Sequence, residues 1–188
     1  IVLARVLTKE DFGVASVLWM SVALFEIGGR LSIENYVVQA KDGGESKVIA
    51  ACHFVQVLLG ILSGILIVIF GGLLASLFKV EDATWAIRMC GLLPVFRGLL
   101  HLDVYRFTRA LNFAPSAYSE LIPNAATTIL IVPIALYHPR YEVLVWILLG
   151  RQIGTTIVTH LYAERRFELL WDGSIVRNVL KFGWPLLV

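Results

Sequence analysis

A long stretch without charge limits what this chain can fold into. Residues 48–78 contain no Asp, Glu, Lys or Arg. A helix needs about 20 mostly apolar residues to cross a hydrocarbon core roughly 30 Å thick, so this stretch is long enough for one span. A soluble domain carries about 25% charged residues, whereas this chain of 188 residues carries 16%. The sequence therefore predicts a membrane protein.

Other apolar stretches predict further spans on both sides of the first. We expect spans over residues 12–39, 48–78, 83–107, 116–137 and 141–164, an amphipathic connection over 165–181, and the start of another span at 182–188. These stretches are too long for barrel strands, and helices satisfy their own backbone groups in lipid. The expected fold is an all-α, polytopic transmembrane helix bundle. We expect the chain to be a fragment of one transmembrane domain in a longer protein.

The basic residues of the short connections predict an orientation. The second, fourth and sixth connections hold eight of them and the first, third and fifth hold four, which places the former in the cytoplasm. The sixth connection also contains an apolar stripe from Phe167 through Trp171 and Val179 to Phe182. With its basic residues, this stripe predicts a helix lying along the inner membrane face, and a partner-binding helix is the alternative.

Several charged residues fall inside the predicted spans. An arginine at the centre of a span costs about 2.5–3.5 kcal/mol, so such residues are expected to face the bundle interior or a wet cavity. The spacing of Glu26, Arg30 and Glu34 puts them on one helix face, where they form either a self-neutralised structural triad or a functional one. The candidate substrate-binding residues are Arg30, Arg88, Arg97, Arg151, Glu26, Glu34 and His101.

Helix geometry separates these candidates further. Arg97 and His101 are four residues apart and share a face, whereas Arg88 and Arg97 are nine apart and point to opposite sides. For Arg88, which lies near Trp85, a headgroup position is the other reading. Guanidinium groups bind phosphate with two hydrogen bonds and stay charged at any pH, so the predicted cargo is anionic.

The other polar residues receive structural readings. His53 and His160 are taken as isolated. Asp103, near a span end, is expected to be solvated, and a coupling-cation site is the alternative. The two cysteines have no spacing typical of a metal site, and no metal, cofactor or catalytic residue is predicted. A net charge of +2 does not indicate a nucleic-acid partner.

Three segments carry a resemblance to a known family. The sequence LARVLTKEDFG at residues 3–13, RFTRALNF at 106–113 and LKFGWP at 180–185 resemble the polysaccharide-transporter branch of the multidrug/oligosaccharidyl-lipid/polysaccharide exporter superfamily. The resemblance implies a two-lobed flippase, of which this chain supplies part of the N-terminal lobe.

The implied cargo is a polyprenyl-pyrophosphate-linked oligosaccharide for O-antigen, capsule or exopolysaccharide synthesis. The implied location is the plasma (inner) membrane of a bacterium or archaeon. The implied partners are the lipid-linked oligosaccharide and the lipid bilayer, with a polysaccharide polymerase and glycosyltransferases as further candidates. Two alternatives stay open, namely a cation-coupled drug exporter of the same superfamily and a polytopic glycosyltransferase or ligase.

Overall fold

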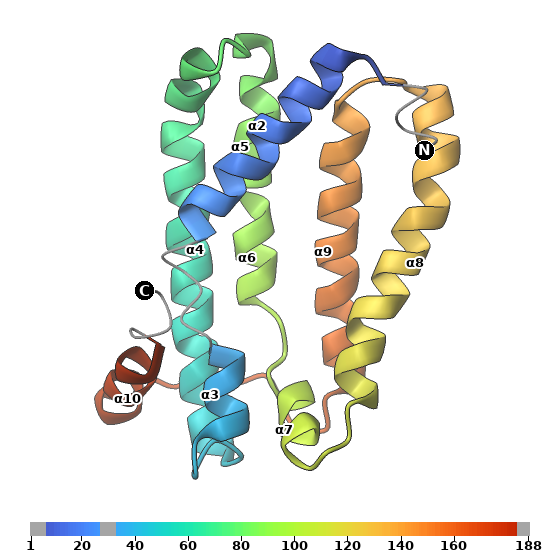
Figure 1. Ribbon diagram of the computed structural model, residues 1–188. Coiled ribbons are helices and arrows are strands. Elements are labelled where there is room, and N and C mark those ends of the chain that lie inside the picture. Colours follow the sequence, from blue (N-terminus) through green and yellow to red (C-terminus); the bar gives the residue numbers. More distant parts are fainter. Residues whose placement is uncertain (1–6, 27–32, 184–188) are drawn as a thin grey trace.

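The computed structural model describes residues 7–26 and 33–183, which form a bundle of helices without a strand in those ranges (Figure 1). This confirms the all-α prediction. The helices are α2 (Lys9–Glu26), α3 (Ile33–Gln39), α4 (Ser46–Leu77), the short 3-10 helix η1 (Glu81–Ala83), α5 (Thr84–Cys90), α6 (Leu92–Gly98), α7 (Asp103–Arg109), α8 (Ala114–Tyr137), α9 (Glu142–Tyr162) and α10 (Gly173–Gly183).

Three of the described helices are long and apolar enough to cross a membrane, namely α4, α8 and α9. In Figure 1, α4 packs along α5 and α6, α8 packs along α9, and α2 crosses them obliquely. Much of the outer surface of α4 is apolar, with exposed residues that include Leu58, Ile61, Leu62, Ile65, Ile69 and Leu73. An apolar surface of this extent suits lipid and not water.

The connections meet alternately at the two ends of the bundle, as the charge-based orientation requires. At one end, the Asp11 carboxylate at the start of α2 accepts the backbone N–H of Tyr141, which precedes α9, at 2.9 Å. At the other end, Arg165 after α9 donates to the Gly44 carbonyl at 2.7 Å, and Arg109 of α7 donates to carbonyls of the same α3–α4 loop. We call this second end the inner end, because the charge count predicts that it faces the cytoplasm.

The predicted span over residues 83–107 is not one straight helix. Helix α6 stops at Gly98, and α7 begins at Asp103 in a direction that differs by 54°. The side-chain nitrogen of Gln56 on α4 lies 3.2, 3.1 and 3.1 Å from the carbonyl oxygens of Arg97, Gly98 and Leu100. These hydrogen bonds give the Gly98 and Leu100 carbonyls a donor at the break and add to the Leu100 N–H that the Arg97 carbonyl already accepts, so the bend is stable in an apolar surrounding.

Replacing Gln56 by leucine is expected to lower the free energy of unfolding by about 1–3 kcal/mol, because the carbonyls at the bend lose their donor. Thermal unfolding of the full-length protein in detergent measures this loss of stability. The signal is the reaction of the buried Cys52 and Cys90 thiols with a fluorescent dye as unfolding exposes them. The matched control is Gln152→Leu, since the buried Gln152 amide nitrogen has no acceptor among the described residues. Equal melting temperatures for the two variants would refute the role of Gln56.

The connection after α9 contains no helix over residues 163–172, and α10 begins only at Gly173. The predicted helical stripe is therefore wrong for Phe167 and Trp171. The Phe167 ring instead packs on His53 of α4 with 4.3 Å between ring centroids, and the backbone N–H of Leu170 donates to the Ala50 carbonyl at 3.2 Å. Contacts with α4, which a helical pattern does not reveal, hold this segment in a non-helical form.

Asp172 sets the start of α10. Its carboxylate accepts the backbone N–H groups of Ser174 at 3.0 Å and Ile175 at 3.3 Å, which is typical of an N-cap residue. The same carboxylate lies 2.7 Å from the Lys47 ammonium at the start of α4. The hydrogen bonds from Lys47 and from the Ser174 hydroxyl hold the pKa of Asp172 well below its ordinary value. Helix α10 is thereby attached to the inner end of α4.

Candidate functional site

Two of the predicted arginines line one pocket. Arg97 comes from the last turn of α6 and Arg151 from the middle of α9, and the pocket between them has a volume of about 230 Å³. Gln152 is the third polar residue of the lining. The remaining wall residues are Trp19, Val22, Ala23, Leu93 and Leu148. The packing of α2, α6 and α9 therefore brings together two guanidinium groups that are far apart in the sequence.

The charges of this pocket favour an anion. Arg97 pairs with Glu34 of α3, with 3.8 Å between its Nη2 and the carboxylate Oε1. Arg151 is exposed, and no carboxylate of the described ranges lies within ion-pair distance of it. The buried amide nitrogen of Gln152 has no acceptor within the same ranges. Two guanidinium groups and an unused amide donor can together bind a phosphate-type group.

The other arginine and glutamate candidates lie elsewhere. Arg88 is exposed on α5, and its side chain runs along Gly71 and Gly72 of α4 instead of entering the pocket. Its separation from Arg97 agrees with their nine-residue spacing. Arg30 and the side chain of Glu26 lie outside the described residues, so Glu34 is the described member of the predicted triad. Whether these residues bind substrate stays a prediction.

His101 is buried at the bend between α6 and α7, beyond the end of α6, so it does not share a helix face with Arg97 as predicted. Its ring lies 4.9 Å from that of His53 and 5.1 Å from that of His160, measured between centroids. The prediction that His53 and His160 are isolated is therefore wrong. The packing of the helices brings the three histidines together, because they come from distant positions in the sequence.

The three histidines serve backbone groups that the bend leaves without helical partners. His53 Nε2 accepts the N–H of Leu102 at 3.0 Å, and a ring nitrogen of His160 donates to the Leu99 carbonyl at 2.9 Å. His101 Nδ1 accepts the N–H of Asp103 at 3.2 Å. Each of these bonds uses one ring nitrogen in a defined role, so the cluster has a structural function at the bend.

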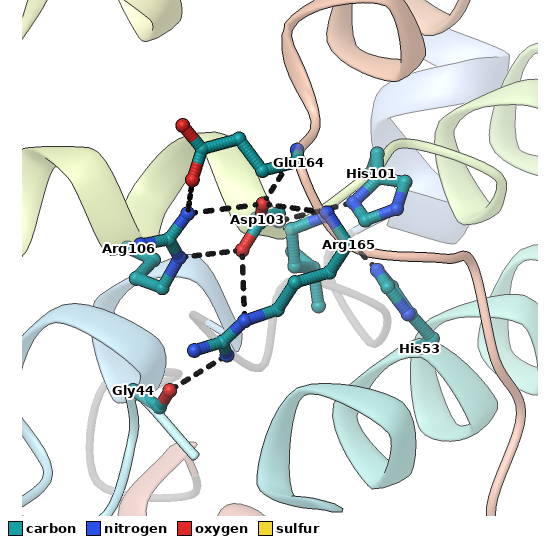
Figure 2. A network of polar contacts seen from close by, with 8 residues as sticks. Gly44, His53, His101, Asp103, Arg106, Glu164 and Arg165 are labelled. Atoms are coloured by element: carbon teal, nitrogen blue, oxygen red, sulfur yellow. Dashed lines mark hydrogen bonds and ion pairs between the residues drawn. The ribbon is translucent and has the colours of Figure 1, made fainter. Parts of the chain in front are cut away.

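Asp103 is fully buried, contrary to the prediction that it is solvated. Figure 2 shows its carboxylate between Arg106 and the segment that follows α9. Arg106 donates from Nε at 2.7 Å and from Nη2 at 3.4 Å, and the backbone N–H groups of Glu164 and Arg165 donate at 3.0 and 3.3 Å. Arg106 also pairs with the Glu164 carboxylate at 2.6 Å. Burial of this charge is tolerated because four hydrogen-bond donors and two cations surround it, the second cation being Arg165 with its Nε 3.8 Å from the carboxylate.

Sequence reasoning missed two residues that build this region. Gln56 could have been singled out from the sequence, since a lone amide inside an apolar span needs a hydrogen-bond partner. Asp103 gave a weaker signal, because Arg106 lies three residues later but the other donors come from the segment after α9. Within the described ranges no cluster of three or more His, Cys, Asp or Glu side chains is arranged to hold a metal ion.

Comparison with known families shows the family of this chain. A family model described as "polysaccharide biosynthesis protein" matches residues 2–188. The chain belongs to this family. The match covers nearly the whole chain and agrees with the resemblance to polysaccharide transporters. Searches of curated proteins and of solved structures returned no match.

This polysaccharide biosynthesis protein is a membrane protein, as its apolar helices and its family both indicate. The two polar regions of this protein differ in the hydrogen-bond donors that they can offer to a ligand. Arg151 and the Gln152 amide give the pocket donors for a ligand beside Arg97, whereas the donors around Asp103 are already engaged by its carboxylate. The pocket is therefore the better candidate for binding, and the Asp103 network is the better candidate for holding the inner end together.

Proposed function

We propose that the protein is a flippase. Its cargo is a polyprenyl-pyrophosphate-linked oligosaccharide, which it moves from the cytoplasmic to the outer leaflet of the inner membrane of a bacterium or archaeon. The observation that carries the proposal is the pocket between membrane helices that Arg97 and Arg151 both line. The transported lipid would serve O-antigen, capsule or exopolysaccharide synthesis, after glycosyltransferases and before a polymerase. No bond of the cargo is made or broken.

The surroundings of the pocket also favour a lipid-linked cargo. A second groove of about 400 Å³ runs between α2 and α9 and shares Trp19 and Leu148 with the arginine pocket. Its other lining residues are Phe12, Ala15, Ser16, Leu18, Leu144 and Ile147. An arginine-lined pocket beside an apolar groove suits a molecule with a charged head and an apolar chain.

The size of the pocket limits what it would hold. Its volume of about 230 Å³ is below the roughly 300–1,000 Å³ that is typical of pockets for drug-sized ligands. The pyrophosphate would therefore occupy the pocket, while the sugars would extend outside it. Arginine is suited to this task because it stays charged and can bind phosphate oxygens with two parallel hydrogen bonds.

The charge arrangement favours this proposal over a cation-coupled drug exporter. Such an exporter needs carboxylates in the membrane that are available to a cation. The buried carboxylate of Asp103 is instead paired with Arg106, and that of Glu34 is paired with Arg97. Arg97 is partly neutralised by Glu34 in the same pair, so the charge that favours an anionic cargo is Arg151, which has no carboxylate within ion-pair distance among the described residues.

The test is export by the full-length protein with Arg97 and Arg151 both replaced by alanine. A hydrogen bond to a charged group is worth about 1.5–3 kcal/mol, so each substitution is expected to weaken cargo binding about tenfold or more. Movement of a fluorescent lipid-linked oligosaccharide in proteoliposomes and surface polysaccharide in cells would both be measured. The double variant is expected to lose nearly all of both signals, and Arg→Lys at the same positions is expected to retain part of them.

The matched control for this experiment is Arg140→Ala. Arg140 lies in the connection before α9, pairs with Glu142 at 3.6 Å and is largely exposed, so export is expected to stay at the wild-type level. Protein abundance is measured for every variant. Normal export by the double alanine variant would overturn the cavity proposal, and sugar transfer by the purified protein would favour a glycosyltransferase instead.

A further inference from the structure

Helix α10 has one buried apolar face and a second apolar strip that is exposed apart from Val176, which packs partly on the core. Ile175 and Val179 are buried, and α10 contacts α3 and α4. Val176 and Leu180, one turn apart on a neighbouring face, line an open groove of about 600 Å³ together with Trp171. The exposed fraction is 43% for Leu180 and 63% for Trp171. A second apolar strip of this kind needs an apolar surrounding or a ligand.

The groove has a cationic border. Arg177 and Lys181 lie one turn apart on α10 and line the groove together with the apolar residues. Both are exposed, and neither forms an ion pair within the part of the chain that the structure describes. The nearby Asp172 carboxylate is already paired with Lys47 at 2.7 Å. The groove thus offers an apolar floor beside two cations without a bound counter-charge.

The attachment of α10 to α4 places this groove at the depth of the lipid headgroups. With 32 residues, α4 is about 48 Å long, so about 9 Å extends beyond a centred 30 Å hydrocarbon core at each end. Phe54 lies about 12 Å from the inner end of α4, and its ring is 5.2 Å from that of Trp171. Trp171 therefore lies at the boundary of the hydrocarbon, where tryptophan is enriched in membrane proteins.

We propose that this groove binds an anionic phospholipid of the leaflet at the inner end. An acyl chain lies against Val176, Leu180 and Trp171, and the phosphate lies between Arg177 and Lys181. A zwitterionic lipid could fill the same apolar strip, but its headgroup carries no net charge to neutralise the two cations. The site is separate from the Arg97–Arg151 pocket, so it does not depend on the proposed transport function.

Quenching of tryptophan fluorescence by brominated lipids tests this proposal in the full-length protein reconstituted in phosphatidylcholine vesicles. A variant that retains Trp171 and carries phenylalanine at the other tryptophans reports on the groove. A second variant that retains only Trp146, an exposed residue of α9, reports on ordinary lipid contact. Brominated phosphatidylglycerol is expected to quench Trp171 more strongly than the same fraction of brominated phosphatidylcholine. Trp146 is expected to respond equally to both lipids.

Removing the charges of Arg177 and Lys181 tests how much they contribute to the preference for phosphatidylglycerol. Each Lys or Arg near an anionic surface is worth about 1 kcal/mol, or about fivefold in relative affinity, so R177Q/K181Q is expected to lower the phosphatidylglycerol preference about twentyfold or more. The matched control is K41Q, since Lys41 is exposed at the same end but does not line the groove. Equal quenching of Trp171 by both lipids would overturn the proposal. Absence of quenching would also overturn it and indicate a protein partner on this face.

Discussion

Replacing Asp103 by alanine is expected to lower the free energy of unfolding by about 3–5 kcal/mol, which is the usual cost of removing one partner from a buried ion pair. The substitution leaves the Arg106 and Arg165 guanidinium groups, which are 25% and 32% exposed, without their shared anion. It also removes the acceptor of two backbone N–H groups after α9. The melting temperature in detergent, followed through the buried thiols, measures the effect.

A local readout separates this role from general destabilisation. The backbone amides of Glu164 and Arg165 donate to Asp103, so hydrogen exchange at these two amides should speed up more than exchange in the middle of α4. The matched control is Glu164→Gln, which removes a 66% exposed carboxylate from the same Arg106. A surface pair of this kind contributes about 0–1 kcal/mol. If the Asp103→Ala and Glu164→Gln variants have the same melting temperature, the network does not stabilise the inner end.

Replacing Gly60 and Gly64 by alanine is expected to lower the free energy of unfolding by about 1–3 kcal/mol for each position, because added methyl groups would overpack the α4–α6 contact. A Cβ atom at Gly60 would overlap the carbonyl oxygen of Pro94, and one at Gly64 would lie 2.6 Å from the carbonyl oxygen of Gly91. Backbone atoms cannot turn aside as a flexible side chain can, so α4 and α6 would have to separate.

The chain offers a matched control for this experiment in the same sequence motif. Gly150 and Gly154 on α9 have the same four-residue spacing, yet a Cβ at Gly150 would meet nothing within 4 Å. Gly150→Ala is therefore expected to leave the melting temperature unchanged or to raise it slightly, since alanine favours a helix more than glycine does. A larger loss at Gly150 than at Gly60 would show that the packing of α4 on α6 is not what these glycines provide.

The two glycine pairs illustrate how far the sequence could be interpreted. Spacing alone marks both pairs as surfaces where helices can approach closely. It does not say which helix packs there, because that depends on residues such as Pro94 that are distant in the sequence. The same holds for the candidate site. The cost of burying an arginine identified Arg97 and Arg151 as candidates, but only the packing of α6 and α9 shows that they line one pocket.

For the polar residues at the bend, the interpretation of the sequence was wrong. From their neighbours in the sequence, Asp103 is expected to be solvated, His53 and His160 to be isolated, and His101 to share a helix face with Arg97. In the structure the three histidines bind backbone groups that the break between Gly98 and Asp103 leaves without helical partners, and the Asp103 carboxylate accepts the N–H groups of Glu164 and Arg165 after α9. A break of this kind is tolerated in a membrane helix only where other side chains supply the missing hydrogen bonds. Gln56, His53 and His160 supply them from α4 and α9.

By itself, the sequence determined that this protein is an all-α membrane protein with connections that alternate between two ends. These features follow from apolar length and loop charge, which are properties of consecutive residues. Only the tertiary structure decided where the third span bends, which arginines share a pocket, that residues 163–172 are not helical, and that Asp103 is buried. Those features depend on hydrogen bonds and ion pairs between distant segments, because a buried polar group is stable only where the fold brings a partner to it.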